Sequence, residues 1–182
     1  MDEDIGPDDE FVFMVKAGDA AQAEAVAAAR QALGPENARL IRAADVIHAT
    51  IVHVCDAGIE RAVAVARTLA PLVRIPRFTI VFDRCEWRPH PRHTLNGIAI
   101  LLASELPAPW RNLRTQLAEI PRRLGKPRTG GEQPHMTVAY GCAPFEPVVL
   151  DTPVIWHVTN FQLIRILMGK RRDLEVGRWE LT

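Results

Sequence analysis

The sequence has few cysteines, few aromatic residues and no excess of charge of either sign. Its 182 residues include three cysteines, one tyrosine, and 22 basic against 22 acidic side chains. Three widely spaced cysteines form neither a disulfide framework nor a zinc-binding cluster. The neutral balance argues against a protein that wraps long nucleic acid, because such binding neutralises many phosphates. A small phosphorylated ligand or the end of a strand is compatible with it.

Long apolar stretches are also missing, since the longer ones, such as residues 97–103, are far too short to span a bilayer. The first four residues are acidic where an export signal would be basic. We therefore expect no membrane partner and a location in the reducing cytoplasm. With 48% hydrophobic residues, the chain can still bury a sizeable core. We expect one domain over residues 1–182.

Hydrophobic periodicity predicts a strand, a helix and a second strand at the start of the chain. Residues 11–15 form a continuous apolar run of strand length, and the alanine-rich segment that follows ends before Gly34. A strand is expected over residues 46–54, a helix near 58–72 and a further strand over 78–82.

The first unit recurs in the second half of the chain. An apolar strand near residues 95–103 precedes a helix opened by Pro109, and a strand that carries His135 follows a polar loop. The first strands of the two units are 84 residues apart, and His48 and His135 are 87 apart. The sequence therefore predicts a two-fold repeat.

The proline-rich residues 88–91 are interpreted as the connection between two lobes. These would cover approximately residues 1–90 and 91–182, and they could exchange strands. The end of the chain predicts a hairpin, with one strand over residues 154–168 and another over 174–181.

Two short strings carry the same pattern, a histidine and a threonine two residues apart. Residues 47–51 read Ile-His-Ala-Thr-Ile, and residues 134–138 read Pro-His-Met-Thr-Val. On a strand, this spacing puts both side chains on the same face. A third match, His157 with Thr159, follows the second without a new helix between them, so we interpret it as structural or superficial.

These residue types suit acid–base chemistry on a phosphate. Hydrolysis of a phosphodiester needs a base for water and an acid for the departing oxygen, and histidine can do either near neutral pH. His48 and His135 would do this work, and Thr50 and Thr137 would donate hydrogen bonds to phosphate oxygens. Taken singly, each pair would more often be ordinary core and strand residues, but the duplication favours a site.

Residues 48–51 and 135–138 resemble the paired signatures of the two-histidine (2H) phosphoesterases, which include the LigT-like 2′-5′ RNA ligase-like proteins and the cyclic phosphodiesterases. The resemblance covers nearly the whole chain. It implies a bilobal α+β fold in which two antiparallel sheets, related by a pseudo-two-fold axis, form a central cleft with helices packed outside. It also implies chemistry without metal or cofactor on 2′,3′-cyclic phosphates or 2′-5′ linkages. The implied site residues are His48 and His135 as catalysts, with Thr50 and Thr137 on the phosphate.

Tyr140 follows the second motif where many LigT-like members carry an arginine, which favours the cyclic phosphodiesterase branch. It would contact substrate only if a bulge or strand end turned it toward the histidine face. Regular alternation also predicts that His53 faces away from the first motif. His90 and His93 are interpreted as loop histidines, because no carboxylate or cysteine accompanies them at metal-ligand spacing.

A basic segment over residues 122–131 precedes the second motif and ends in two glycines. It would either steer and cover a phosphate as a lid, or be a solvated helix end whose cations suit the helix dipole. The sequence leaves both interpretations open.

We predict a metal-independent phosphodiesterase that opens 2′,3′-cyclic phosphates of nucleotides or RNA ends. The alternatives are a 2′-5′ RNA ligase or 2′-5′ phosphodiesterase, and a non-catalytic nucleotide- or RNA-binding module. A monomer is expected, because the two halves complete a site within one chain. Base preference, and which histidine is the acid, stay open.

Overall fold

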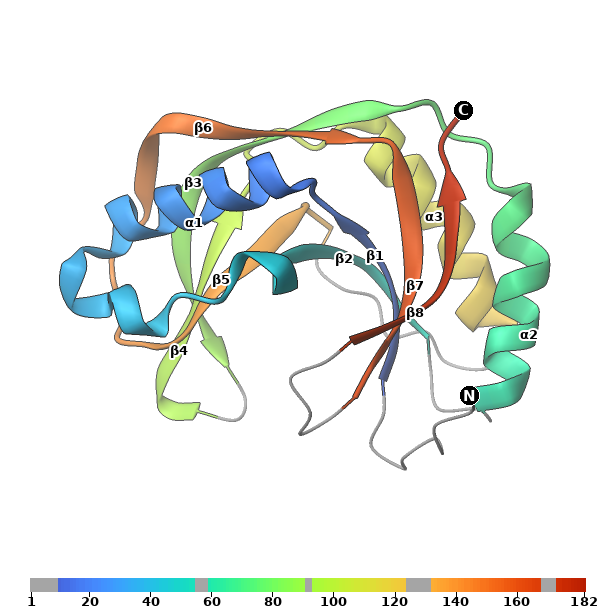
Figure 1. Cartoon of the computed structure of the whole chain (residues 1–182), viewed down its shortest axis with the longest axis horizontal. Helices are drawn as coiled ribbons and strands as arrows, with labels where there is room; N and C mark the ends of the chain where they lie inside the picture. Colours follow the sequence, from blue (N-terminus) through green and yellow to red (C-terminus); the bar gives the residue numbers. More distant parts are fainter. Residues whose placement is uncertain (1–9, 55–58, 91–92, 124–131, 168–172) are drawn as a thin grey trace.

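The computed structural model describes residues 10–54, 59–90, 93–123, 132–167 and 173–182 (Figure 1). Within these ranges the chain forms antiparallel strands, α-helices and short 3₁₀ turns. The strands are β1 (Glu10–Lys16), β2 (His48–Val54), β3 (Phe78–His90), β4 (His93–Leu102), β5 (His135–Cys142), β6 (Val148–Val158), β7 (Asn160–Ile166) and β8 (Asp173–Glu180). The helices are α1 (Asp19–Leu33), α2 (Ile59–Leu69) and α3 (Ala108–Arg122), with 3₁₀ turns η1 (Pro35–Leu40), η2 (Ala44–Val46) and η3 (Ala70–Leu72).

The strands form one sheet in the order β6-β3-β4-β5-β2-β1-β7-β8. The link between β5 and β2 is a single residue pair, Ala49 opposite Met136. The sheet therefore consists of two four-stranded halves that meet at one narrow antiparallel contact. The predicted α+β class is confirmed, and the two predicted sheets are the halves of this continuous sheet.

Each half-sheet combines strands from both ends of the sequence. Strand β3 pairs with β4 and β6, while β7 pairs with β1 and β8. The interpretation of residues 88–91 as a connection between lobes is therefore wrong, because residues 88–90 end β3 and pair with β4. The single strand predicted over residues 154–168 is also wrong. It is two strands, β6 and β7, which separate at Thr159 and enter different half-sheets.

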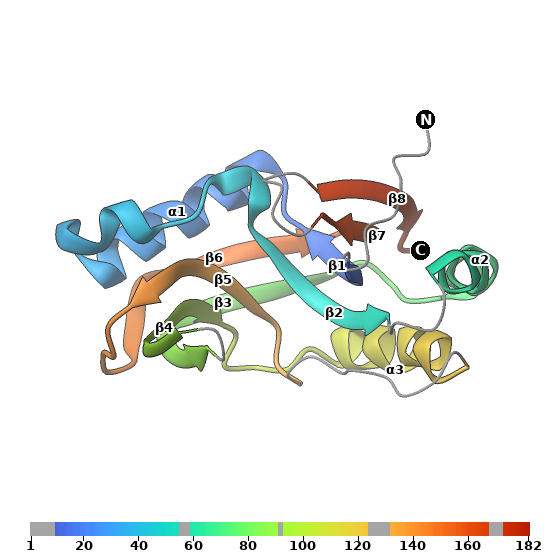
Figure 2. The same cartoon turned by 90° about the horizontal axis from the view of Figure 1, so that it is seen from below.

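Helices α1 and α3 each pack on the half-sheet away from their own sequence neighbours. Helix α1 connects β1 to β2 but contacts β6, and α3 leads from β4 to β5 but contacts β2 (Figure 2). The buried face of α3 has large side chains, Trp110, Leu113 and Leu117, at helical spacing. These residues share one apolar core with the small buried alanines of α1. No helix in the described ranges is both long and apolar enough to cross a membrane.

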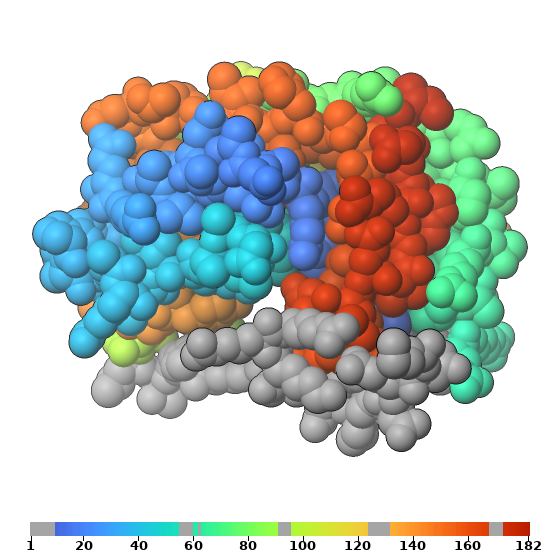
Figure 3. Space-filling view, viewed as in Figure 1, coloured from blue at the N-terminus to red at the C-terminus, as the bar shows by residue number. Residues whose placement is uncertain are grey.

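The opposite face of the sheet is not covered by these helices. Its apolar residues include a separate small cluster of Val12, Met14 and Ile164. In the space-filling view, a hollow lies between the cyan surface near η2 and the red surface of β7 and β8 (Figure 3). This exposed face carries the side chains of both histidine motifs.

Gly97 allows β3 and β4 to approach closely in the half-sheet that carries the second motif. A Cβ atom at Gly97 would lie 2.1 Å from the carbonyl oxygen of Arg88 and 2.5 Å from the Trp87 ring. No side chain fits at that distance. The Trp87 indole N–H in turn donates to the Cys142 carbonyl at 3.0 Å, which ties β3 to β5.

Candidate active site

Both motifs lie where the two half-sheets meet. His48 is the first residue of β2 and His135 is the first residue of β5. Ala49 and Met136, the residues that pair across the junction, are fully buried on the helix side. Because side chains alternate along a strand, their neighbours project to the opposite face. That face therefore gathers four side chains around one antiparallel contact: His48, Thr50, His135 and Thr137.

The two imidazoles are held in the same way. His48 Nδ1 lies 3.0 Å from the carbonyl oxygen of Val46, and His135 Nδ1 lies 3.1 Å from that of Gln133. A carbonyl can only accept, so each Nδ1 carries the hydrogen and donates it. In the neutral ring, Nε2 then has a free lone pair. Each motif thus presents one nitrogen that can take a proton.

Burial keeps both rings neutral near pH 7. Burial, together with a smaller contribution from the positive charge of Arg42, lowers the pKa of His48 to about 4. Burial also lowers the pKa of His135, with smaller contributions in the same direction from Arg88 and Arg114, while its hydrogen bond opposes the change. The site therefore presents two imidazole nitrogens that can accept a proton, with arginine side chains nearby. This arrangement suits a bound anion.

A bulge in β2 turns His53 onto the face of the first motif. Thr50 lies opposite Met14 and His53 lies opposite Val12, with a register shift between the two pairs. Val12 and Met14 are alternate residues on one face of β1, so Thr50 and His53 share that face. The prediction that His53 faces away is therefore wrong. Its Nδ1 is 4.0 Å from a carboxylate oxygen of Glu10.

A second bulge, in β5, turns Tyr140 onto the face of the second motif. Thr137 lies opposite Ile100 and Tyr140 lies opposite Ile98, again with a register shift between the pairs. Both isoleucines line a cavity of about 400 Å³ together with His135. The condition set from the sequence, a bulge that brings Tyr140 to the histidine face, is met.

Tyr140 lies between two other polar groups at this face. Its side chain is 40% exposed, and the guanidinium carbon of Arg42 is 5.4 Å from its ring centroid. The His90 ring meets it edge-on at 5.7 Å, so His90 is the end of a strand beside the site and not a loop residue. Arg42 is fixed by its backbone N–H, which donates to the Val138 carbonyl at 2.8 Å, and by Nη1, which donates to the Thr137 carbonyl at 3.4 Å.

Other residues singled out in the sequence lie elsewhere. His157 is on an exposed position of β6, where its Nδ1 is 3.0 Å from Thr79 Oγ1. Residues 124–131 of the basic segment and the side chain of His93 fall outside the described residues. Among the residues that are described, no three His, Cys, Asp or Glu side chains are grouped so that they could hold a metal ion.

The cations around the motifs were not predicted from the sequence. Arg42, Arg88 and Arg114 come from a loop, the end of β3 and helix α3, and none stands at a fixed spacing from a motif. Their placement depends on the strand exchange and on the packing of α3. The bulges had a visible signal, since two consecutive apolar residues follow the threonine in each motif, at 51–52 and 138–139.

Comparisons with known proteins find the fold but no sequence family. No family model and no curated protein matches the sequence. A solved phosphoesterase structure is 21% identical with a TM-score of 0.74, over 95% of this chain and 98% of that one. E. coli LigT in complex with 3′-AMP is 21% identical with a TM-score of 0.76 over the same shares. The protein TT0787 of Thermus thermophilus is 18% identical with a TM-score of 0.67, over 94% of this chain and 97% of that one.

The chain therefore has the fold of the LigT-like phosphoesterase structures, over nearly its whole length. The resemblance that the paired motifs predicted is confirmed at the level of the fold.

Proposed function

We propose that this protein is a phosphoesterase that opens 2′,3′-cyclic phosphates of nucleotides or RNA ends by two-histidine acid–base catalysis. The observation that carries the proposal is the matched pair of imidazoles. Each donates Nδ1–H to a carbonyl two residues earlier and so leaves Nε2 for chemistry. Both stand on one face beside a threonine, around the Ala49 and Met136 contact.

The reaction uses one imidazole as a base and the other as an acid. The base takes a proton from water through Nε2 while the water oxygen forms a bond to phosphorus. The bond from phosphorus to one ribose oxygen breaks, and the acid gives its Nε2 proton to that oxygen. Thr50 and Thr137 donate hydroxyl hydrogen bonds to the non-bridging oxygens, where charge builds in the transition state. The product is a phosphate monoester.

The charge of the substrate supplies the protonation state that the reaction needs. Both rings are neutral near pH 7 because burial and nearby cations lower their pKa values. A phosphate anion between them favours the charged imidazolium, so it raises the pKa of both rings and admits one proton. One neutral and one protonated histidine is the pair that the reaction requires, and its rate should show a bell-shaped dependence on pH.

The similar structures support a nucleotide as the ligand. E. coli LigT has been crystallised with 3′-AMP, with ATP and with phosphate. A 3′-monophosphate is the chemical product of opening a 2′,3′-cyclic phosphate at the 2′ oxygen. We therefore take a nucleoside 2′,3′-cyclic phosphate as the first substrate to test.

We assign the base role to His48 and the acid role to His135. The pKa of His48, about 4, keeps its Nε2 unprotonated across the neutral range. His135 lines the cavity of about 400 Å³, where a leaving ribose oxygen can reach its Nε2. Tyr140, on the same face, would contact the nucleoside.

The experiment is incubation with nucleoside 2′,3′-cyclic phosphates in EDTA, with chromatographic separation of the 2′- and 3′-monophosphates. A single product isomer is expected, since one ribose oxygen faces the acid. No turnover of any cyclic phosphate, with cleavage of 2′-5′ linked dinucleotides instead, would replace this proposal by the 2′-5′ phosphodiesterase alternative.

The acid and base roles are separated by a substrate whose leaving group needs no proton. A nucleoside 3′-(4-nitrophenyl phosphate) releases nitrophenolate, so His135→Ala should lose far less activity on it than on the cyclic phosphate. His48→Ala should lose similar activity on both. Equal losses for both variants on both substrates would contradict the assignment.

A further inference from the structure

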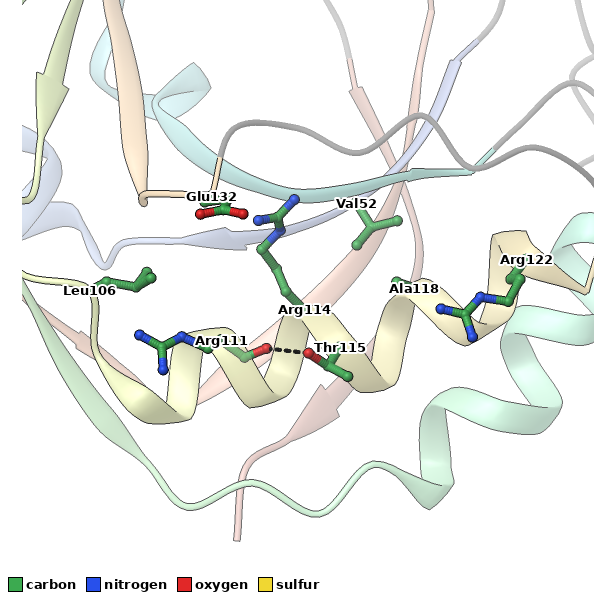
Figure 4. A pocket seen from close by; sticks show the side chains of 8 residues that line it. All are labelled: Val52, Leu106, Arg111, Arg114, Thr115, Ala118, Arg122 and Glu132. Atoms are coloured by element: carbon green, nitrogen blue, oxygen red, sulfur yellow. Dashed lines mark hydrogen bonds between the residues drawn. The ribbon is translucent and has the colours of Figure 1, made fainter.

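Helix α3 forms one wall of a second cavity, next to the one that His135 lines. This cavity has a volume of about 280 Å³, and its lining includes Arg111, Arg114 and Arg122 from α3 (Figure 4). Leu106 and Glu132 line both cavities, so the two are adjacent. The three arginines stand on one face of α3 within about three turns, and the side chain of Arg114 extends toward Glu132 (Figure 4).

The path between the cavities is held in place by the core. Trp110, fully buried on α3, donates its indole N–H to the carbonyl of Glu132 at 3.1 Å. Gln133, the next residue, accepts the Nδ1 hydrogen bond of His135. The segment from α3 to the catalytic imidazole is therefore fixed by two successive backbone contacts. Arg114 lines the α3 cavity beside Glu132, and its charge is one of the smaller contributions that lower the pKa of His135.

The charges of this cavity favour an anion. Arg122 forms an ion pair with Glu119 at 2.7 Å, so its charge is largely matched within α3. Arg111 is exposed, and Arg111 and Arg114 together outweigh the one acidic side chain of the lining, Glu132. Guanidinium groups present parallel N–H donors to phosphate oxygens, which makes arginine the preferred partner of a phosphodiester.

We propose that the α3 cavity is a second phosphate site, which binds a backbone phosphate of an oligoribonucleotide while its terminal cyclic phosphate lies between the histidines. This inference rests on the proposed function and narrows its substrate class from mononucleotides to RNA ends. A cyclic mononucleotide has one phosphate and fills only the histidine site. An RNA end has further phosphates and fills both.

The test compares kcat/KM for a cyclic mononucleotide with kcat/KM for a pentaribonucleotide that ends in a 2′,3′-cyclic phosphate. The protein should prefer the pentanucleotide, and Arg111→Gln should reduce that preference about tenfold through loss of one charge-assisted contact. The slope of log(kcat/KM) against log salt for the pentanucleotide should fall by about 0.7, the value for one single-strand phosphate contact. Arg30→Gln, an exposed arginine on α1, is the matched control and should change neither quantity.

The proposal of a second site would be overturned if wild type did not prefer the pentanucleotide. It would also be overturned if Arg111→Gln and Arg30→Gln reduced that preference equally. Failure of the proposed function is a different result, namely no turnover of either substrate. In that case, fluorescence anisotropy with a labelled 2′-O-methyl pentanucleotide bearing a 3′-phosphate still decides the inference. Weaker binding by Arg111→Gln than by Arg30→Gln supports the site, and equal binding by both rejects it.

Discussion

Replacement of His48 by asparagine should remove a large part of the acid sensitivity of this fold. The folded pKa of His48 is about 4, below its ordinary value of 6.5. Between these values the unfolded chain binds a proton at this position that the folded chain does not, so stability falls as pH falls. The contribution of His48 to the free energy of unfolding is fully present above pH 6.5 and is lost progressively as the pH falls to 4.

The difference of about 2.5 pKa units is worth about 3 kcal/mol in full, at 1.36 kcal/mol per unit. Between pH 7 and pH 4.5 it amounts to about 2 kcal/mol. Asparagine does not titrate, and its side-chain N–H can still donate to the Val46 carbonyl, as His48 Nδ1 does.

The assay is urea denaturation of wild type and His48→Asn at pH 7 and pH 4.5. Wild type should lose about 2 kcal/mol more than the variant between the two pH values, whatever their absolute stabilities. Parallel losses in both proteins would refute the claim that His48 is buried as a neutral ring.

Three further sets of variants test the packing and the site. Gly97→Ala should lower the free energy of unfolding by about 1–3 kcal/mol in a urea titration, because its Cβ would lie 2.1 Å from a backbone carbonyl oxygen. Gly18→Ala is the control. A Cβ at Gly18 would have no atom within 4 Å, so this variant should lower the free energy of unfolding less. Thr50→Val and Thr137→Val should each lower kcat on a cyclic phosphate by about 100-fold, since each removes one donor to the phosphate, and an unchanged kcat would exclude that role. Tyr140→Phe should leave KM nearly unchanged, because the face of the ring makes the contact with the nucleoside. Tyr140→Ala removes the ring and should raise KM about threefold. Equal effects of the two variants on KM would instead assign this contact to the hydroxyl group.

Local structure was largely predictable from the sequence. The apolar run at residues 11–15 is the centre of β1, and the alanine-rich segment is α1, which ends at Gly34 with a positive φ of 73°. The apolar spacing after Pro109 predicted α3 and its buried face. These elements follow from periodicity and caps, which depend on neighbouring residues only.

Long-range pairing was not predictable in the same way. Residues 154–168 form an apolar segment that reads as one strand, but Thr159 separates two strands that join different half-sheets. Their partners, β3 and β1, lie about 75 and 150 residues earlier, and no local rule selects them. The same applies to Arg42, whose position beside Tyr140 depends on its backbone bond to Val138.

The histidine site was predictable as a pair of motifs, but the faces of later residues were not. Alternation correctly places His48 with Thr50 and His135 with Thr137. It fails after the threonines, because each strand has a bulge at two consecutive buried residues. His53 thereby joins the site face against expectation.

The central claim is tested most directly by the initial rate of 2′,3′-cyclic AMP hydrolysis in wild type, His48→Ala, His135→Ala and His157→Ala. His157 belongs to the third His-x-Thr match but lies on β6 away from the site, so it serves as the control. We predict losses of about 100- to 10,000-fold for each of the first two variants and none for the control. Activity retained in either His48→Ala or His135→Ala, or lost in His157→Ala, would contradict the two-histidine site.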